Sequence, residues 1–236
     1  MQKKIYILFF LAGICAKFSL AQEDSTSQRI ACTLNVTELQ KWRTEFGHHK
    51  EFPAQYELQI LAALSHFPEL KSTGIKFRLH SSHASLKTRI NFWTFFNQRE
   101  NRRYTITIST KSVEKMEPLL LGKLPEKAKV GVLGHELSHV SDFSKKSMFQ
   151  CIGVGFGHLS QTYIDSLEFN TDRICIRHGL GNELEAWSSF IRKTMKVENW
   201  RGSDFVNKPE SHVERYMNPD TIRREMDSLN APQNSH

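Results

Sequence analysis

The segment 131–142, GVLGHELSHVSD, constrains this chain most because it holds a single H-E-x-x-H pattern. Residues four apart lie on one face of an α-helix, so His135 and His139 would direct two imidazoles at one metal ion. Glu136 would stand beside them to move protons. An apolar stripe on the opposite side would bury the helix behind the site: Leu133, Leu137 and Val140. The pattern therefore predicts a half-buried helix that carries a zinc site.

A third ligand must come from elsewhere, because catalytic zinc usually takes three protein ligands and leaves one position for water. The extended pattern with a nearby third histidine is excluded, since Asp142 and Lys145 stand where it needs glycine and histidine. The segment 165–172, DSLEFNTD, offers carboxylates at helical spacing. We predict Glu168 as the third ligand and Asp172, one turn later, as the hydrogen-bond acceptor for a ligand imidazole. The alternative for this aspartate is an ion pair with a neighbouring arginine.

Other residues compete for these roles. Asp165 is the main alternative ligand, and His158 and His178 are weaker ones. Asp142 lies three positions after His139, so it is predicted either to orient an imidazole or simply to be solvated.

The order His-Glu-Leu-Ser-His at 135–139, followed by Glu-Phe-Asn-Thr-Asp at 168–172, resembles the gluzincin metallopeptidases. It is most similar to the minimal minigluzincins, which are related to the peptidase units of the CAAX prenyl proteases. The resemblance covers about residues 50–190. It implies that His135, His139 and Glu168 bind zinc and that Glu136 is the general base. It also implies a strand beside the cleft that pairs with an extended peptide.

The chain departs from the family further on, where the family has His-Pro and a later arginine. Here His212-Val213 is followed by Arg215. We predict His212 as the group that stabilises transition-state charge, with Arg215 and Tyr216 as alternatives. The sequence shows no multi-span membrane domain, so processing of prenylated proteins within the membrane is not implied.

The start of the chain is typical of a secretory signal peptide, with a basic start, an apolar run at 5–15 and small residues before the predicted cleavage site after Ala21. The domain boundaries that follow are a signal peptide at 1–21, a flexible leader at 22–34 and a single domain at 35–236. We expect an exported protein, periplasmic or secreted, without a stable membrane anchor. A lipoprotein anchor at Cys15 and an uncleaved anchor are weaker alternatives.

The basic character of the chain belongs partly to the predicted signal peptide. Segment 1–21 contains three lysines and no acid, so its removal lowers the formal net charge from +7 to +4. The remaining charges are scattered along the sequence, which argues against nucleic acid as a partner. The predicted partner is instead a peptide or protein substrate bound as an extended strand.

Three cysteines remain after the signal peptide, which is an odd number. A Cys151–Cys175 disulfide is the first pairing to expect in an oxidising compartment, with Cys32 left free. The alternative is that all three are buried thiols.

Alternating runs at 75–80 and 103–110 predict strands, and the aromatic run 91–96 predicts a third strand or hairpin arm. Gly153 to Gly157 should break the chain, and Gly131 and Gly134 indicate close approach to a neighbour, with the sheet as the suggested one. Helices are expected at 36–46, 53–67, 125–143, 160–178, 182–196 and 219–229. The predicted fold is α+β, with a small mixed or antiparallel sheet, the edge strand 103–110 beside the site helix, and a mainly helical C-terminal half.

These features predict an exported zinc-dependent metalloendopeptidase in which Glu136 activates water. The same chemistry on another amide or ester is an alternative, and so is a latent enzyme. The alternative from a different class is a non-catalytic secreted binding or chaperone-like module with a structural zinc.

Overall fold

The computed structural model describes residues 37–82, 84–203 and 212–231. The predicted signal peptide and leader, together with Cys32, lie outside the described residues. The chain divides into two compact units, Met1–Lys41 and Trp42–His236. In the first unit residues 37–41 are helical, and the second unit holds the sheet and the remaining helices.

The sheet is mixed and has the strand order β1-β2-β4-β3. β1 and β2 run parallel, β2 and β4 also run parallel, and β3 is antiparallel to β4. The strands are β1 (Lys50–Glu51), β2 (Gly74–His80), β3 (Leu86–Ile90) and β4 (Arg103–Ser109). The α+β class and a small mixed sheet are therefore confirmed.

The identity of the edge strand was predicted wrongly. β4 is an interior strand, hydrogen-bonded to β2 on one side and to β3 on the other. The edge strands are β1 and β3, and β3 is the one that contacts α3 (Glu126–Lys145), the helix of the H-E-x-x-H pattern. The sequence pattern missed β3 because it is short and carries two charges. We predicted a strand or hairpin arm in the aromatic run that follows β3. That run instead forms a short helical turn, which Asn91 caps by accepting a hydrogen bond from the Trp93 amide.

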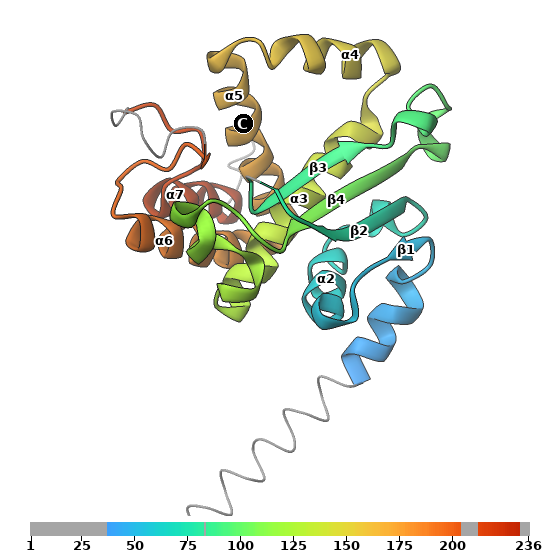
Figure 1. Ribbon diagram of the computed structural model, residues 1–236, viewed down its shortest axis with the longest axis horizontal. Helices are drawn as coiled ribbons and strands as arrows, with labels where there is room; N and C mark the ends of the chain where they lie inside the picture. The colour runs from blue at the N-terminus through green and yellow to red at the C-terminus, as the bar shows by residue number, and fades with distance from the viewer. Residues whose placement is uncertain (1–36, 83, 204–211, 232–236) are drawn as a thin grey trace, which may run out of the picture. The chain divides into compact units, whose positions relative to one another are not determined.

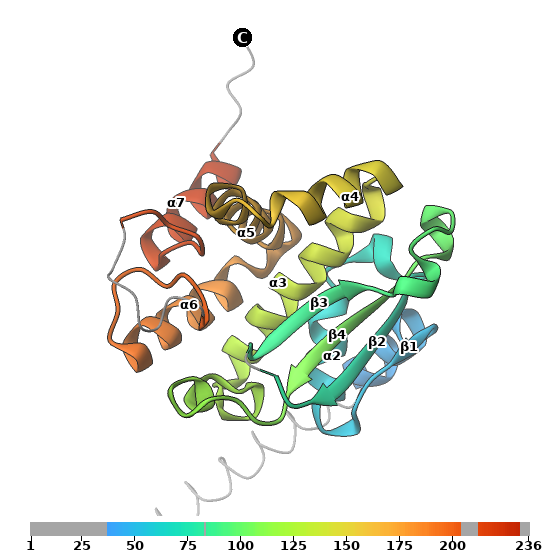
Figure 2. The same cartoon turned by 45° about the horizontal axis from the view of Figure 1, so that its top comes forward.

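The two faces of the sheet differ in polarity. Tyr104, Ile106 and Ile108 of β4 are buried, as the alternating pattern predicted. This face lies against helices α2 (Glu57–Leu64) and α3 (Glu126–Lys145), as Figures 1 and 2 show. The opposite face carries exposed charged side chains, including Lys87 and Arg89 of β3.

The helix α3 is the centre of the fold, since it contacts α2, β3 and two helices of the C-terminal half. The prediction of a mainly helical C-terminal half is confirmed (Figure 2). Its helices are α4 (Met148–Gly157), α5 (Gln161–Cys175), a π-helical turn η7 (Ile176–Leu180), α6 (Gly181–Met195) and α7 (Pro219–Asn230). Short 3-10 turns complete the structure at Ala54–Tyr56, Pro68–Leu70, Phe92–Thr94, Arg99–Asn101, Glu114–Leu119 and Leu121–Lys123.

The two glycines of α3 allow close helix packing. A Cβ atom on Gly131 would lie 2.1 Å from the Glu183 carbonyl oxygen of α6, and one on Gly134 would lie 2.5 Å from Leu180 Cδ1. The predicted close approach is confirmed, but the neighbour is the α6 side of the fold rather than the sheet.

The predicted break at Gly153 to Gly157 is wrong, because these residues belong to α4. The helix is started by a capping box in which Ser147 and Gln150 satisfy each other's backbone N–H groups. Gly153 and Gly155 face open space, so these two glycines serve no close packing.

The predicted Cys151–Cys175 disulfide is also wrong. Both cysteines are free, buried thiols, and they lie in different surroundings. Cys151 accepts a long contact from Arg102 Nη1 at 3.7 Å, whereas Cys175 Sγ packs against Gly134. Burial raises the pKa of both thiols, which keeps them protonated and unreactive.

Candidate metal centre

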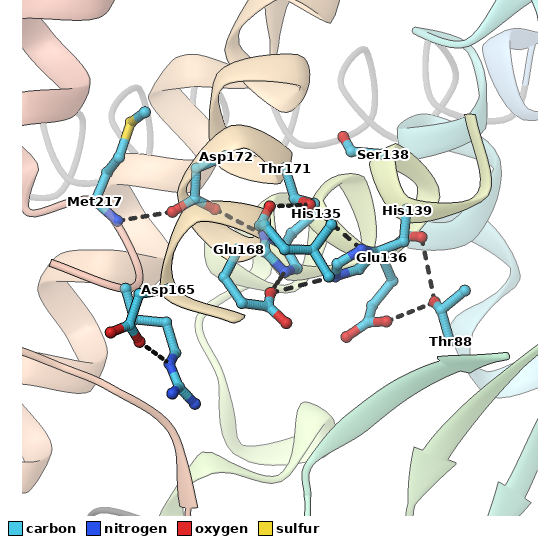
Figure 3. Close-up of polar contacts among 12 residues, drawn as sticks. Thr88, His135, Glu136, Ser138, His139, Asp165, Glu168, Thr171, Asp172 and Met217 are labelled. Atoms are coloured by element: carbon cyan, nitrogen blue, oxygen red, sulfur yellow. Dashed lines mark hydrogen bonds and ion pairs between the residues drawn. The ribbon is translucent and has the colours of Figure 1, made fainter. Parts of the chain in front are cut away.

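Three predicted ligands converge from two helices (Figure 3). His135 and His139 project from one face of α3, and Glu168 faces them from α5. Glu168 Oε2 lies 3.1 Å from His135 Nε2 and 3.3 Å from His139 Nε2. All three ligand atoms lie within 4.8 Å of one another, so the group can hold a metal ion.

The Nδ1 atom of each imidazole also has a hydrogen-bond partner. His135 Nδ1 lies 2.7 Å from Asp172 Oδ1. A carboxylate only accepts hydrogen bonds, so Nδ1 carries a proton, and with a metal bound Nε2 would present its lone pair to the centre of the cluster. The predicted role of Asp172 as an imidazole acceptor therefore agrees with its position, one turn beyond Glu168.

His139 is oriented by a residue that the sequence analysis did not select. Its Nδ1 lies 3.3 Å from Thr171 Oγ1, and the same hydroxyl donates to the Leu167 carbonyl oxygen at 2.9 Å. Because a threonine hydroxyl has a single proton, it accepts from His139 Nδ1. This again leaves Nε2 free to face the cluster. The position beside Asp172 was the available signal, but adjacency alone does not place a hydroxyl on a particular imidazole.

Glu168 and His135 are buried together, and each shifts the pKa of the other. Burial acts to raise the pKa of Glu168, but His139 and His135 hold that pKa well below its usual range. Burial acts to lower the pKa of His135, but its hydrogen bonds to Asp172 and Glu168 raise the pKa well above the ordinary value. A dication would replace the imidazole proton as the partner of the Glu168 carboxylate.

Glu136 lies next to the cluster and is held by the edge strand. Thr88 Oγ1 of β3 is 2.5 Å from Glu136 Oε2 and 3.2 Å from the Glu136 backbone oxygen. The Glu136 residue is 7% exposed. The contact with Thr88 places the edge strand directly beside the candidate centre, although this strand was not predicted.

The segment before α7 packs against the cluster through Asp172. Its second oxygen, Oδ2, accepts from the Met217 backbone N–H at 2.7 Å. The neighbouring Tyr216 ring lies 5.5 Å from the His135 ring and 5.7 Å from the Trp187 ring, centroid to centroid. Burial and the charges of Glu168 and Glu136 raise the pKa of Tyr216 well above its ordinary value, so its phenol remains a donor.

The predicted role of His212 stays a prediction. Its side chain is exposed, and the ring that lies against His135 is that of Tyr216. Arg215, the other alternative, is committed elsewhere: its Nε donates to Asp165 Oδ1 at 2.7 Å. Side-chain direction in an irregular segment depends on its tertiary contacts, so the sequence pattern alone does not show which of these side chains faces the cluster.

Asp165 is not a ligand in this arrangement. It is buried, and it accepts hydrogen bonds from Arg215 and, at 2.6 Å, from Arg201 Nη2. Figure 3 shows its carboxylate bound to a guanidinium and separate from the imidazoles. Its function is to fasten the 212–218 segment to α5.

The remaining candidates also lie in other contacts. Asp142 forms an ion pair with Lys146 through both of its oxygens, so its expected role in orienting an imidazole is wrong. His158 Nδ1 lies 2.7 Å from the Val154 carbonyl oxygen. His178 bridges the Ile174 carbonyl oxygen and Glu69.

Comparisons with known proteins return nothing for this chain: no protein-family model, no curated protein and no solved structure matches it. What the centre does must therefore be inferred from its own geometry.

Proposed function

We propose that the chain is a zinc-dependent metalloendopeptidase of the gluzincin type. One observation carries this proposal: His135 Nε2, His139 Nε2 and a Glu168 oxygen converge within 4.8 Å, with Glu136 held beside them. A site that only stores or scaffolds a metal has no need for a free carboxylate at that position.

The donor set suits zinc. Two neutral imidazoles and one carboxylate are ligands of catalytic zinc sites that keep a position open for water. Asp172 and Thr171 account for both Nδ1 protons, so the nitrogens that face the centre are unprotonated once a metal is bound. Zinc, when bound, supplies Lewis acidity that activates water and polarises a carbonyl group.

The chain's own groups then handle protons and charge. Glu136 accepts a proton from the attacking water and passes it to the leaving amine. The hydrogen bond from Thr88 fixes the rotamer of this carboxylate while leaving its other oxygen for the water. We assign Tyr216 as the donor to the developing oxyanion, because its phenol stays protonated and its ring packs on His135.

The edge strand β3 provides the surface for a peptide. Its partner β4 occupies one side, so the other side can accept an extended substrate through main-chain hydrogen bonds. Thr88 belongs to this strand and contacts Glu136, so an added peptide would run past the general base. This proposal replaces β4 with β3 as the substrate-binding strand. The export predicted from segment 1–21 remains part of the proposal.

The test combines metal analysis with cleavage of a mixed peptide library. The purified wild-type chain should contain one zinc per molecule and cleave peptides. Glu136→Gln should retain the metal and lower the turnover rate by about 10²–10⁴-fold, the usual contribution of a general base. Glu126→Gln, the same change at an exposed position on the same helix, is the matched control and should cleave at the wild-type rate.

Two results would overturn the proposal. One is Glu136→Gln cleaving every peptide as fast as the wild type. The other is wild-type protein that binds zinc stoichiometrically yet cleaves no peptide, amide or ester, which would favour the non-catalytic binding module.

A further inference from the structure

The most exposed apolar side chains of the described residues gather on two segments, 92–96 and 149–159. Six large side chains there are each at least 67% exposed, and every other described large apolar residue is less exposed. They are Phe92, Trp93, Phe96, Phe149, Phe156 and Leu159, which we call the apolar surface. Single exposed apolar residues are ordinary, but six of the largest on two segments indicate an interaction site.

The two segments are neighbours in the structure. The connection from β3 to β4, which carries the aromatic residues, is tied to the start of α4 by Arg99 and Arg102. Arg99 Nη1 donates to the Lys145 carbonyl oxygen at 3.1 Å, and Arg102 Nη1 donates to the Lys146 carbonyl oxygen at 2.8 Å. Figures 1 and 2 both show this connection beside the first turn of α4.

The helix α4 exposes three large apolar side chains, those of Phe149, Ile152 and Phe156. Within it only Cys151 and Val154 are buried. The segment 147–164, which contains this helix, has no Asp, Glu, Lys or Arg. Because the domain's own core does not cover this apolar helix face, we look for a partner surface that does.

The two segments that carry the apolar surface are rich in cations. Segments 86–104 and 143–164 together contain seven lysines and arginines and one acid, Glu100. Among the described residues, Arg89, Arg99, Arg103 and Lys145 form no ion pair. Of the seven cations, Arg102 is buried and Lys146 pairs with Asp142, so the others are the ones available to an anionic partner.

We infer that the apolar surface and its flanking cations dock this protein on an anionic phospholipid bilayer. Tryptophan and phenylalanine insert at the boundary between headgroups and acyl chains, and lysine and arginine attract the anionic headgroups. A second copy of the chain fits less well, since a two-fold symmetric contact would place these cations against their own copies.

The docking is interfacial. No helix of the described residues has the length and apolarity to cross a bilayer, and α4, with 10 residues, extends only about 15 Å. Because α4 connects the two helices that hold the candidate metal centre, docking would keep that centre close to the membrane. The inference does not depend on the proposed peptidase activity.

The test measures co-sedimentation of the full chain with vesicles of phosphatidylcholine alone or mixed with phosphatidylglycerol. Trp93→Ser/Phe149→Ser/Phe156→Ser should lower the partition coefficient on the mixed vesicles by about tenfold or more. Arg99→Glu/Lys145→Glu should remove the preference for phosphatidylglycerol, since each nearby cation contributes about fivefold. Val113→Ser/Leu229→Ser, changes to exposed apolar residues elsewhere, is the matched control and should bind as the wild type does.

A second readout locates the contact. Vesicles with brominated acyl chains should quench the fluorescence of Trp93, and Trp93→Phe should lose that quenching while it still binds. Circular dichroism and urea denaturation report whether each variant is folded.

All variants share the same N-terminal segment, so binding that arises from that segment would be equal in every one. Equal binding of the wild type and the triple variant overturns the inference. So does a wild type that ignores vesicles but forms a dimer, measured by sedimentation velocity, that the triple variant abolishes.

Discussion

The candidate metal centre and the helix α4 are adjacent in the chain but are built on opposite principles. In α3 and α5, polar side chains face inward and are held by named partners, as in the chain from Met217 N–H to Asp172 to His135. In α4, apolar side chains face outward and only Cys151 and Val154 are buried. In these helices, the polarity of a side chain therefore does not predict whether it is buried.

The difference has a physical reason. A buried polar group is tolerated when each donor and acceptor has a partner, and the imidazole–carboxylate–amide chain meets that condition. An exposed apolar helix forgoes the stabilisation of burial until a partner surface covers its apolar face. The first region needs internal order, and the second needs an outside surface.

The largest effect should come from removing a candidate ligand. Glu168→Ala leaves two imidazoles that cannot hold a metal tightly, so the metal should be lost on dialysis. At a zinc concentration of about 1,000 times the dissociation constant, the wild type should gain about 4 kcal/mol of stability, and the variant should gain almost none. Thermal unfolding with and without zinc measures this gain. Asn170→Ala, an exposed change on the same helix, should behave as the wild type, and an equal gain in Glu168→Ala would show that the ligand is another residue.

Apolar substitutions in the two regions should differ in effect because the side chains differ in burial rather than in chemistry. Leu133 of α3 is fully buried and Phe156 of α4 is 71% exposed. Leu133→Ala should lower the free energy of unfolding by about 2–5 kcal/mol, whereas Phe156→Ser should change it by no more than about 0.5 kcal/mol. Urea denaturation of both variants makes the comparison. A large loss for Phe156→Ser would mean that α4 is packed in solution.

The two buried aspartates of α5 separate metal support from structural support. Asp172→Asn should lower zinc affinity about 10–100-fold, because the neutral amide orients and polarises His135 less well. Asp165→Asn should leave zinc affinity unchanged and lower stability instead, since it leaves Arg215 and Arg201 without their carboxylate. Competition with a zinc chelator gives the affinity, and equal affinities for the two variants would contradict the assignment.

The smallest change in stability is expected from Glu69. Its carboxylate accepts hydrogen bonds from Ser141 of α3 at 2.5 Å and from His178 at 2.9 Å. Burial acts to raise the pKa of Glu69, but these partners hold the pKa below its ordinary value of 4.5. A carboxylate with a depressed folded-state pKa stabilises the fold above its unfolded-state pKa. Its contribution is lost as the pH falls through the folded-state value.

Glu69→Gln should therefore cost about 1 kcal/mol at neutral pH, with the difference from wild type shrinking as the pH falls below about 4.5. Unfolding free energies measured from pH 7 to pH 3 test this expectation. Glu114→Gln serves as the control on an exposed carboxylate, and a difference that grows as the pH falls would show that the sign is wrong.

Much of this fold could be predicted because its signals are local. The 3.6-residue periodicity located α3, α5, α6 and α7 to within a few residues, and alternation located β2 and β4 with the correct buried face. The spacing of four between His135 and His139 fixed two candidate ligands on one helix face. The same spacing, between Glu168 and Asp172, predicted the two carboxylates that the structure brings to His135.

The errors concern features that local pattern cannot contain. The edge strand β3 is short and charged, so its place beside Glu136 follows only from the sheet order. Thr171 could not be linked to His139, nor Asp165 to Arg215, without knowing how the helices face each other. The free thiols of Cys151 and Cys175 depend on their separate surroundings in the fold, which sequence spacing does not reveal.

The sequence by itself determined the helix that carries His135, Glu136 and His139, because residues four apart share a helix face whatever surrounds them. Only the tertiary structure decided which carboxylate reaches those imidazoles, which strand lies beside the cluster, and that α4 turns its apolar side chains outward. These outcomes depend on contacts between residues that are distant along the chain, and such contacts are set by the packing of whole elements.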